Sequence, residues 1–474
     1  MRLRRRFVVP VLLALPFTVL AAWPTNSTED LVVARMAAPT IDGLLADKDG
    51  GVAVLFEDAV TAQGIDLFVE QVTAAGTRVL NTATDGGFRG KSLVGAVNDQ
   101  RGQQLVTDGA GGFYALWIEG FTQLRVARFG GDGTQVGSFS TFMATAGQGQ
   151  IQSDGTGGVY VAYDRTLIHL DATGAPLAGP VSISGSADNR ASAITPIDAF
   201  GTVASNSNYL IPLINSFTPS LTSRWTVQGA PSALLASGAR FITVTDTKGG
   251  AWVVFNSAQH GDDVYVQHIY LDGGYQFFDA GLQDPQPIAV FTGVQTQVAA
   301  SADGTGGLYV VYTDTRSGQT LLYVQHVNAA GQPEWNVGNG GELLTTQPVT
   351  TRVGALALVG SNDVMVAWGA ENPATIRAQR YASDGGRQWP FGGAIVSTPA
   401  QNYTYLRNFE GVRLTDGSAI VGMGYYDGTG SNKPEVHLKR IPLDGLFYDA
   451  GMGPGGGAGG SGGSAGGGGG GSAG

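Results

Sequence analysis

Short runs of alternating or continuous apolar residues recur along the chain between glycine-rich turns. Val52–Phe56 and Leu308–Tyr312 are two such runs, and both are rich in β-branched and aromatic residues. Runs of this kind are typical of half-buried or fully buried strands. We find no segment with the 3.6-residue apolar period of an amphipathic helix. The pattern therefore predicts an all-β chain of short strands joined by tight turns.

A glycine phrase that starts with aspartate separates many of these runs. Its best copies read Asp-Gly-x-Gly-Gly, and looser copies keep the same frame at intervals of 44 to 61 residues. The eight copies begin at Asp47, Asp108, Asp154, Asp198, Asp246, Asp303, Val359 and Asp416. A regular period of about 50 residues indicates a repeat architecture.

Other positions keep step with the phrase. Five residues after its second glycine stands an aromatic residue, namely Phe56, Trp117, Tyr163, Phe255, Tyr312, Trp368 and Tyr425. A turn glycine follows later, at Gly76, Gly133, Gly174, Gly273, Gly331, Gly385 and Gly445. Five residues before it the side chain is always polar, as in Gln71, Arg128, His169, His268, His326, Arg380 and Arg440. The fourth copy departs from this pattern between Ser205 and Ser223.

Each repeat contains four predicted strands, which is the composition of a β-propeller blade. A two-sheet sandwich would lack so long a period, and a β-helix would need shorter coils. We predict eight blades, with seven as the alternative. The strand Leu31–Met36 precedes the first repeat, and we expect it to close the ring by pairing with the eighth repeat, which has little chain after Gly445. The alternative is that residues 446–449 form the outer strand and residues 31–36 cross a face.

The repeats resemble those of a family of secreted bacterial proteins. Blades of that family carry D-G-x-G-G, an alternating strand, an aromatic residue, an acidic residue, and then a strand that ends in Q-R or Q-H. The resemblance covers roughly residues 40–450 of this chain. It implies a β-propeller fold and no particular activity.

The two ends of the chain differ from the repeats. Residues 1–22 combine four arginines with an apolar run from Phe7 to Ala22, which predicts a signal peptide for either the general secretory or the twin-arginine route. Residues 23–450 are the predicted propeller domain. The glycine- and serine-rich residues 451–474 are a predicted disordered tail or a linker. We therefore expect a secreted protein that is extracellular or periplasmic.

Composition and charge narrow the class of partner. Removing residues 1–22 takes away four arginines and no acid, so that the formal net charge of −11 becomes −15. This balance argues against nucleic acid and anionic lipid as partners. The remaining chain has no stretch long and apolar enough for a transmembrane helix. It contains no cysteine, which excludes disulfides and a thiolate nucleophile. We expect a monomer.

The aspartate of the glycine phrase could suggest a calcium loop. Only Asp47 and Asp49 approach the alternating acidic oxygens that such a loop requires. An aspartate that accepts hydrogen bonds from the amides that follow it, with glycines at positive φ, explains the phrase without a metal. We therefore predict a structural turn and no metal site.

A second acidic set lies two residues after the in-step aromatic, where strands give way to loops. It comprises Asp58, Glu119, Asp314 and Asp427. Because these positions repeat, the four side chains should surround one face and could bind a cation, a sugar or a basic partner. The alternative is that they are solvated loop acids, paired in places with a neighbour such as Arg316.

The residues give little sign of catalysis. His169, His268 and His326 share a position that is Arg or Gln in other copies, which suits hydrogen bonding or solvent exposure better than metal ligation. We find no G-x-S-x-G elbow and no phosphate-binding glycine loop before a helix. We therefore predict a non-enzymatic module that binds a protein or glycan or serves as a scaffold, without a cofactor. The alternative is a carbohydrate-active hydrolase or lyase, which unpaired carboxylates of raised pKa at one end of the central channel would favour.

Overall fold

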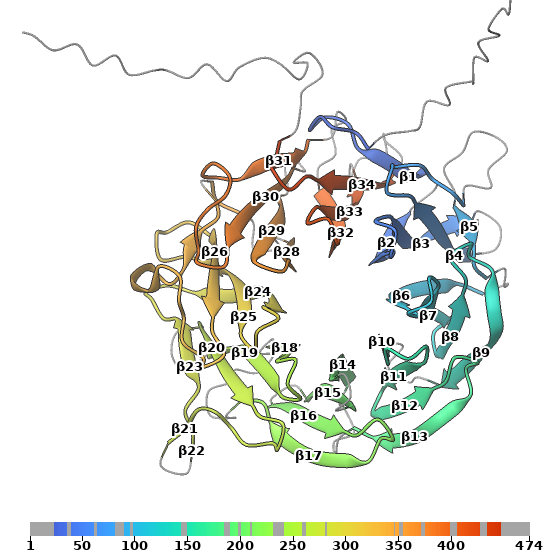
Figure 1. The fold of residues 1–474 in the computed structure, drawn as a ribbon, viewed down its shortest axis with the longest axis horizontal. Helices are drawn as coiled ribbons and strands as arrows, with labels where there is room; N and C mark the ends of the chain where they lie inside the picture. The colour runs from blue at the N-terminus through green and yellow to red at the C-terminus, as the bar shows by residue number, and fades with distance from the viewer. Residues whose placement is uncertain are drawn as a thin grey trace, which may run out of the picture.

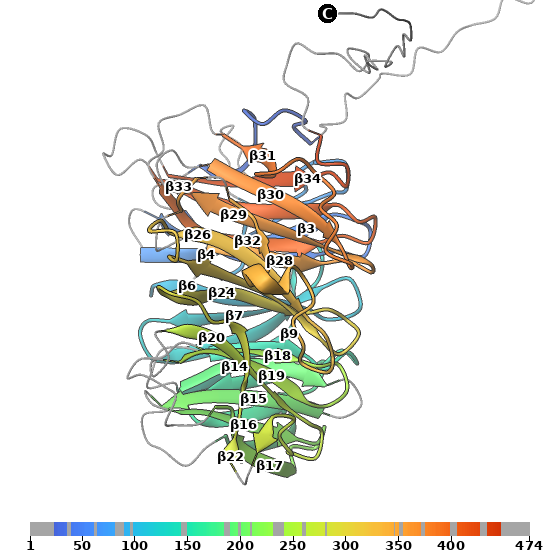
Figure 2. The same cartoon turned by 90° about the vertical axis from the view of Figure 1, so that its left-hand side faces the viewer.

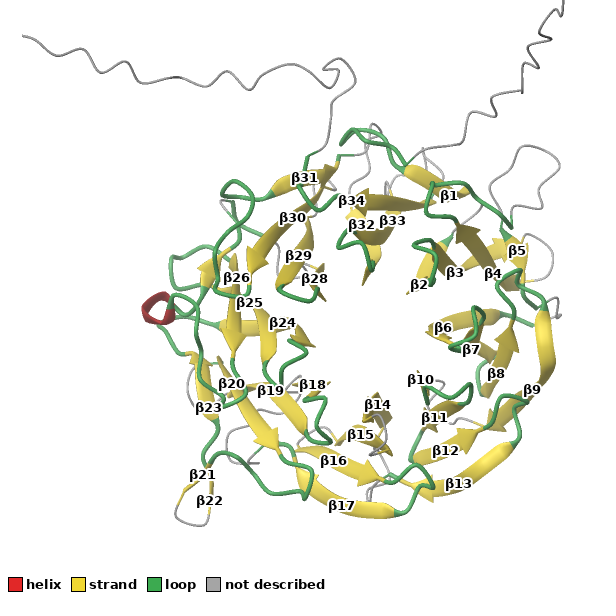
Figure 3. Cartoon of the chain, viewed as in Figure 1, coloured by secondary structure: helices red, strands yellow, loops and turns green. Residues whose placement is uncertain are grey.

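The computed structural model describes residues 23–35, 39–60, 64–80, 90–94, 98–143, 149–183, 190–197, 201–208, 211–230, 241–257, 262–279, 282–345, 347–349, 354–370, 375–398, 405–426 and 434–446. The predicted signal segment, the predicted tail and Asp427 lie outside these residues. Within the described chain the only helical element is the short 3-10 turn η4 (Val337–Asn339) at the outer rim (Figure 3). The prediction of an all-β chain is confirmed.

Eight four-stranded antiparallel sheets make up the described chain, and Figure 1 shows them side by side around a central axis. We number them in chain order. The strands of each sheet are given from the inner to the outer one. Sheet 1 contains β2 (Thr40–Ala46), β3 (Val52–Val60), β4 (Gly64–Val72) and β5 (Lys91–Ser92), and sheet 2 contains β6 (Gln100–Thr107), β7 (Phe113–Glu119), β8 (Gln123–Phe129) and β9 (Gln135–Met143). Sheet 3 contains β10 (Gly149–Ser153), β11 (Val159–Tyr163), β12 (Thr166–Leu170) and β13 (Pro176–Ser182), and sheet 4 contains β14 (Arg190–Ile197), β15 (Gly201–Asn208), β16 (Ile211–Phe217) and β17 (Ser223–Gln228).

Sheets 5 to 7 follow the same plan, whereas sheet 8 takes its fourth strand from the start of the described chain. Sheet 5 contains β18 (Phe241–Thr245), β19 (Ala251–Ser257), β20 (Asp263–Ile269) and β23 (Gln286–Ala289), and sheet 6 contains β24 (Gln295–Ala302), β25 (Leu308–Asp314), β26 (Leu321–Val327) and β27 (Glu342–Leu343). Sheet 7 contains β28 (Gly354–Val359), β29 (Asp363–Ala370), β30 (Thr375–Ala382) and β31 (Ala394–Ser397), and sheet 8 contains β32 (Tyr405–Arg413), β33 (Ala419–Tyr426), β34 (Glu435–Ile441) and β1 (Leu31–Arg35). A small hairpin, β21 (Phe278–Asp279) and β22 (Leu282–Gln283), projects from sheet 5.

The antiparallel order gives the assembly of sheets two faces, which Figure 2 shows edge-on. The glycine phrase joins the first and second strands of a sheet, and the turn glycine follows the third strand, so both lie on one face. We call this the turn face. The loops between the second and third strands lie on the opposite face, which we call the loop face.

The core lies between neighbouring sheets. The in-step aromatics Phe56, Trp117, Phe255, Tyr312 and Trp368 are each at most 1% exposed. Trp117 of sheet 2, for example, packs in one cluster with Leu55 and Val69 of sheet 1. Tyr163 is half-buried against Phe142. The in-step aromatics therefore belong to the core between sheets.

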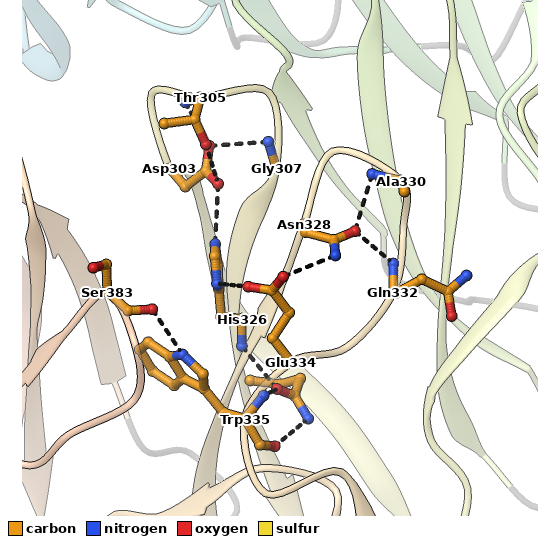
Figure 4. A network of polar contacts seen from close by, with 11 residues as sticks. Asp303, Thr305, Gly307, His326, Asn328, Ala330, Gln332, Glu334, Trp335 and Ser383 are labelled. Carbon is orange, nitrogen blue, oxygen red and sulfur yellow. Dashed lines mark hydrogen bonds and ion pairs between the residues drawn. The ribbon is translucent and has the colours of Figure 1, made fainter.

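The aspartate of the glycine phrase forms the predicted turn. Asp303 Oδ1 accepts the amides of Thr305 at 2.7 Å and Gly307 at 2.9 Å (Figure 4). Its Oδ2 bonds to Nε2 of His326 at 3.0 Å, so the in-step polar residue is the partner of the phrase. The same pairing joins Asp108 to Arg128, Asp154 to His169, Asp246 to His268 and Asp416 to Arg440. In sheet 7, whose phrase begins with Val359, the last residue of the phrase, Asp363, pairs with Arg380. The three histidines are buried, so hydrogen bonding is the correct interpretation and solvent exposure is not.

Tryptophans tie each of several sheets to the next. Trp335 Nε1 donates to the carbonyl of Ser383, two residues before the turn glycine of the following sheet, at 3.1 Å (Figure 4). Trp225 and Trp389 form the equivalent bonds to Leu271 and Leu443. Trp23 does the same to Ala74, two residues before Gly76, at 2.9 Å. A residue from the start of the described chain therefore supplies this bond to sheet 1.

Strand β1 pairs antiparallel with β34, so the first and last parts of the described chain share one sheet (Figure 1). Leu31 lies opposite Leu438, and Arg35 lies opposite Glu435, with which it forms an ion pair. The predicted strand Leu31–Met36 is thus present as Leu31–Arg35, since Met36 lies outside the described residues. The buried Lys439 of β34 also donates to the carbonyls of Asn26 and Glu29.

Candidate functional site

The acidic residues predicted from the repeat lie at the loop-face ends of the second strands, and local partners hold two of them. Glu119 forms an ion pair with Arg125 at 2.6 Å. Asp314 accepts the amide of Arg316 at 2.8 Å and its Nε at 2.7 Å. Asp58 is fully buried, and Asp427 lies outside the described residues. The three described side chains come from sheets 1, 2 and 6, and their role in ligand binding stays a prediction.

A different acidic group gathers around the innermost strand β2. In β2, Ile41 pairs with Phe56 and Gly43 pairs with Leu55, so Asp42 is an extra residue in a β-bulge. A bulge re-aims a side chain relative to the regular pleat and is frequent beside functional sites. The innermost strand β6 has a register shift at the matching place, between Gly102 and Gln104.

The bulge directs the Asp42 side chain toward sheet 2. A side chain at Gly102 would collide with its carboxyl group, so this position accommodates Asp42 only because it is glycine. Although Asp42 as a whole is half-buried, its Oδ2 is out of contact with solvent and has no hydrogen-bond partner among the described residues. A buried acceptor without a partner is costly, unless the group is protonated or a ligand supplies the hydrogen bond.

Neighbouring charges add to the effect of burial. Burial raises the pKa of Asp42 well above its ordinary value, the charges of Glu57 and Glu410 raise it further, and Arg101 opposes them. Arg101 lies 3.6 Å from Glu57 and is 47% exposed, so one cation faces several carboxyl groups. We call Asp42, Glu57 and Glu410 the axial carboxyl cluster.

Glu410 contributes to this cluster from sheet 8, on the innermost strand β32. Burial raises its pKa to about 7. The cluster therefore spans β32 of sheet 8 and β2 and β3 of sheet 1, beside Arg101 on β6 of sheet 2. The innermost strands β32, β2 and β6 adjoin one another around the axis in Figure 1. A carboxyl group with this pKa is half protonated near neutral pH, so it can donate or accept a proton there.

Glu410 departs from the repeat. Counted from the bulges, it occupies the position of Leu44 in sheet 1, Leu105 in sheet 2 and Ala300 in sheet 6. An acid therefore stands where other sheets carry an apolar side chain. No group of three His, Asp or Glu side chains suited to a metal ion occurs among the residues described.

Comparison with known proteins yields no match to a protein family and none to a curated sequence. Solved structures are similar in fold at low identity. One is a prolyl endopeptidase with 10% sequence identity and a TM-score of 0.44. The match covers 84% of this chain and 54% of the endopeptidase chain, so this chain spans about half the length of that enzyme. Another is the Nup133 β-propeller domain of Vanderwaltozyma polyspora, with 8% identity and a TM-score of 0.39 over 69% of this chain and 91% of that domain. A third is an ulvan lyase of family PL25, with 11% identity and a TM-score of 0.41 over 88% of this chain and 95% of the lyase chain.

The strand content and the arrangement of the sheets around an axis make the chain a protein of the β-propeller type. At these identities and TM-scores, no residue role is transferred from these structures. Across the described residues, no helix has the length and apolar character that a membrane crossing requires.

Proposed function

We propose that this protein is an exported, non-enzymatic β-propeller that binds a polar ligand at the axial carboxyl cluster. The observation that carries the proposal is the buried Asp42 oxygen without a hydrogen-bond partner, beside two further carboxyl groups. The repeated polar positions, in contrast, serve the turns and the contacts between strands. The apolar run before Trp23 and its preceding arginines support export.

The chemistry of the cluster favours a ligand that carries an ammonium or guanidinium group. Glu57 and Glu410 act on Asp42 as like charges, and Arg101 opposes them, so a further positive charge would relieve this repulsion. The chain without residues 1–22 has a net charge of −15, which attracts a cation at long range. Cation binding would hold the carboxyl groups in their charged form, so affinity should fall as the pH drops below about 7, where Glu410 becomes protonated.

Titration calorimetry with spermidine and hexalysine tests this proposal at pH 8.0 and pH 5.5. We expect binding by the mature protein at pH 8.0, at least tenfold weaker binding at pH 5.5, and a similar loss in Glu410→Gln and Asp42→Asn. Asp49→Asn, which removes an exposed acid on the turn face, is the control and should bind like wild type. Equal binding by Glu410→Gln and wild type would contradict the proposal.

The pKa of Glu410, about 7, favours a second candidate function. A carboxyl group of this kind is suited to donate a proton to the leaving oxygen of a glycosidic bond, with Asp42 as the second carboxyl of a hydrolase or lyase. A reducing-end assay on neutral and uronate-containing polysaccharides distinguishes the two functions. Turnover that is abolished in Glu410→Gln, while that variant still binds substrate, would establish the enzyme and exclude the binding module.

We infer that the eight sheets are the blades of one closed ring and that the segment 23–35 closes it. The pairing of β1 with β34 and the bond from Trp23 to Ala74 support this closure. Removing residues 23–37 would expose the edge of β34 and leave Lys439 buried without its carbonyl partners. We expect a truncated protein with a melting temperature lower by several degrees that aggregates on heating. An unchanged melting temperature without aggregation would exclude the closure.

A further inference from the structure

A groove of about 430 Å³ opens on the turn face between sheets 5 and 6, far along the ring from the axial carboxyl cluster. We call it the Tyr270 groove. Its walls include Asp246, Lys248, His268, Tyr270, Leu271 and Asp272 from sheet 5, with Gly306 and Ala329 from sheet 6. This volume is within the range of small-molecule sites.

Tyr270 is an aromatic residue at a position where other sheets carry small or turn-capping residues. It opens the turn after the third strand, where Tyr270 and Gly274 form the same backbone bond as Ala382 and Gly386 in sheet 7. In sheet 6 the first turn residue, Asn328, caps the turn through its side chain. In sheets 5 and 7 an aspartate two residues later takes over that role. The turn therefore does not require the Tyr270 ring, which is 43% exposed.

Lys248 is a second departure, from the repeat position that Thr156 and Thr305 occupy in sheets 3 and 6. The Thr305 hydroxyl bonds to Asp303 of its own phrase. Lys248 keeps the backbone bond to Asp246, and its side chain is exposed. The side chain extends across to sheet 6, where a Cβ on Gly306 would lie 2.7 Å from Nζ.

Buried neighbours hold the Tyr270 ring in place. The His268 ring contacts it edge-on, with 5.0 Å between centroids, and stacks on Trp252 at 4.1 Å. His268 is itself fixed by Asp246 at 2.9 Å and by Gln276 at 2.6 Å. The ring is therefore preoriented, which lowers the entropy lost when a ligand binds to it.

We propose that the Tyr270 groove binds one ring of an uncharged oligosaccharide. The exposed ring offers an apolar face for the C–H face of a sugar. Lys248 can donate hydrogen bonds to sugar hydroxyls, and Asp272 can accept them. Asp246 is buried and bonded to His268, so the charged groups that the groove presents to a ligand are Lys248 and Asp272, one of each sign. This balance favours a neutral ligand over an acidic or a basic one. A small open site of this kind predicts dissociation constants in the millimolar range.

Reversion to the residues of other sheets tests the proposal without endangering the fold. Tyr270→Ala copies sheet 7, and Lys248→Thr copies sheets 3 and 6. Binding of cellohexaose, maltohexaose and chitohexaose is measured by ligand-observed NMR and calorimetry on the mature protein. We expect at least one of them to bind, with affinity about three- to tenfold lower in each variant. Lys48→Thr, which removes an exposed lysine from the sheet 1 phrase, should bind like wild type.

The outcomes separate this site from the axial carboxyl cluster. Glu410→Gln should bind the oligosaccharides normally, whereas the spermidine binding proposed above should be normal in Tyr270→Ala. The proposal is overturned if none of the three oligosaccharides binds, if Tyr270→Ala binds as tightly as wild type, or if oligogalacturonate binds more tightly than they do.

Discussion

Replacing Glu70 by glutamine should stabilise the protein, and only above mildly acidic pH. In sheets 6 and 7, Gln325 and Gln379 occupy the position just before the in-step polar residue. Gln325 Oε1 accepts the amides of His326 and Trp335, and its Nε2 donates to the Trp335 carbonyl at 2.9 Å. The side chain thereby satisfies donors and acceptors ten residues further along.

Sheet 1 has Glu70 at this position in the same geometry. Its Oε1 accepts the amides of Gln71 and Leu80, at 3.0 and 2.7 Å. Oε2 stands in place of the donating nitrogen, and it is buried without a hydrogen-bond partner in the described chain. Burial raises the pKa of Glu70, against the opposing effects of these amides and of Arg78.

The Glu70→Gln variant replaces an unsatisfied buried oxygen by a donor. We expect a gain of about 1–2 kcal/mol at pH 8, reduced by the lost attraction of Arg78. Because the folded state binds the Glu70 proton more tightly than the unfolded state does, wild type loses stability as the pH rises above about 4.3. The difference between variant and wild type should therefore be near zero at pH 4 and reach its full size once the pH exceeds the folded pKa.

Scanning calorimetry at pH 4, 6 and 8 measures the melting temperatures of variant and wild type. For a chain of this length, the expected free-energy difference at pH 8 corresponds to a difference in melting temperature of roughly 1–2 °C. The matched control is Gln325→Glu, which should lose a similar amount at pH 8 and much less at pH 4. A Glu70→Gln variant that is less stable than wild type at pH 8, or a difference that does not change with pH, would refute the reasoning.

Three other predictions follow from the packing and the turns. Trp117→Ala should lower the free energy of unfolding by about 3–5 kcal/mol; a loss below about 1 kcal/mol in denaturant unfolding would place the ring in water. Trp23→Phe should keep the apolar contact but lose the bond to Ala74, at about 1 kcal/mol, and Trp23→Ala should lose more in the same assay. Burial opposes ionisation of Asp303, but hydrogen bonds from His326 and the Thr305 amide hold its pKa far below the ordinary value. Wild type should therefore lose stability as the pH falls below about 3.9, and Asp303→Asn should lose less over this range.

The repeat predicted the strands, the buried aromatics and the aspartate turns, because each depends on residues close together in the sequence. It failed in the fourth copy, where a search for a turn glycine finds none. The turn residue there is Leu221, with φ of +57° and the same backbone bonds as the glycine turns. Leu221 is 3% exposed and packs with Tyr160 of sheet 3. Core packing therefore stabilises a conformation that leucine rarely adopts.

The axial carboxyl cluster could not be predicted from spacing. Asp42 and Glu410 lie more than 300 residues apart, and a bulge, which the apolar pattern does not reveal, sets the direction of Asp42. The repeat instead predicts Asp58, the neighbour of Glu57 on β3, because an acid recurs at that position in other copies. One sequence feature could have indicated the cluster: Glu410 is an acid within a strand, at a position that is apolar in other sheets.

Departures from a repeat mark function only when the fold gains nothing from them. Glu70 is buried and Glu410 is half-buried, and both are acids of raised pKa at positions where other sheets have neutral residues. Removing either charge should stabilise the ring at pH 8, since desolvation opposes both. Their effects on spermidine binding should differ, because Glu70 faces backbone groups of its own sheet, whereas Glu410 acts on Asp42 across sheets. If Glu410→Gln stabilises the protein and abolishes binding while Glu70→Gln only stabilises it, Glu410 is retained for its ligand. If both variants bind like wild type, Glu410 is a tolerated defect of the repeat.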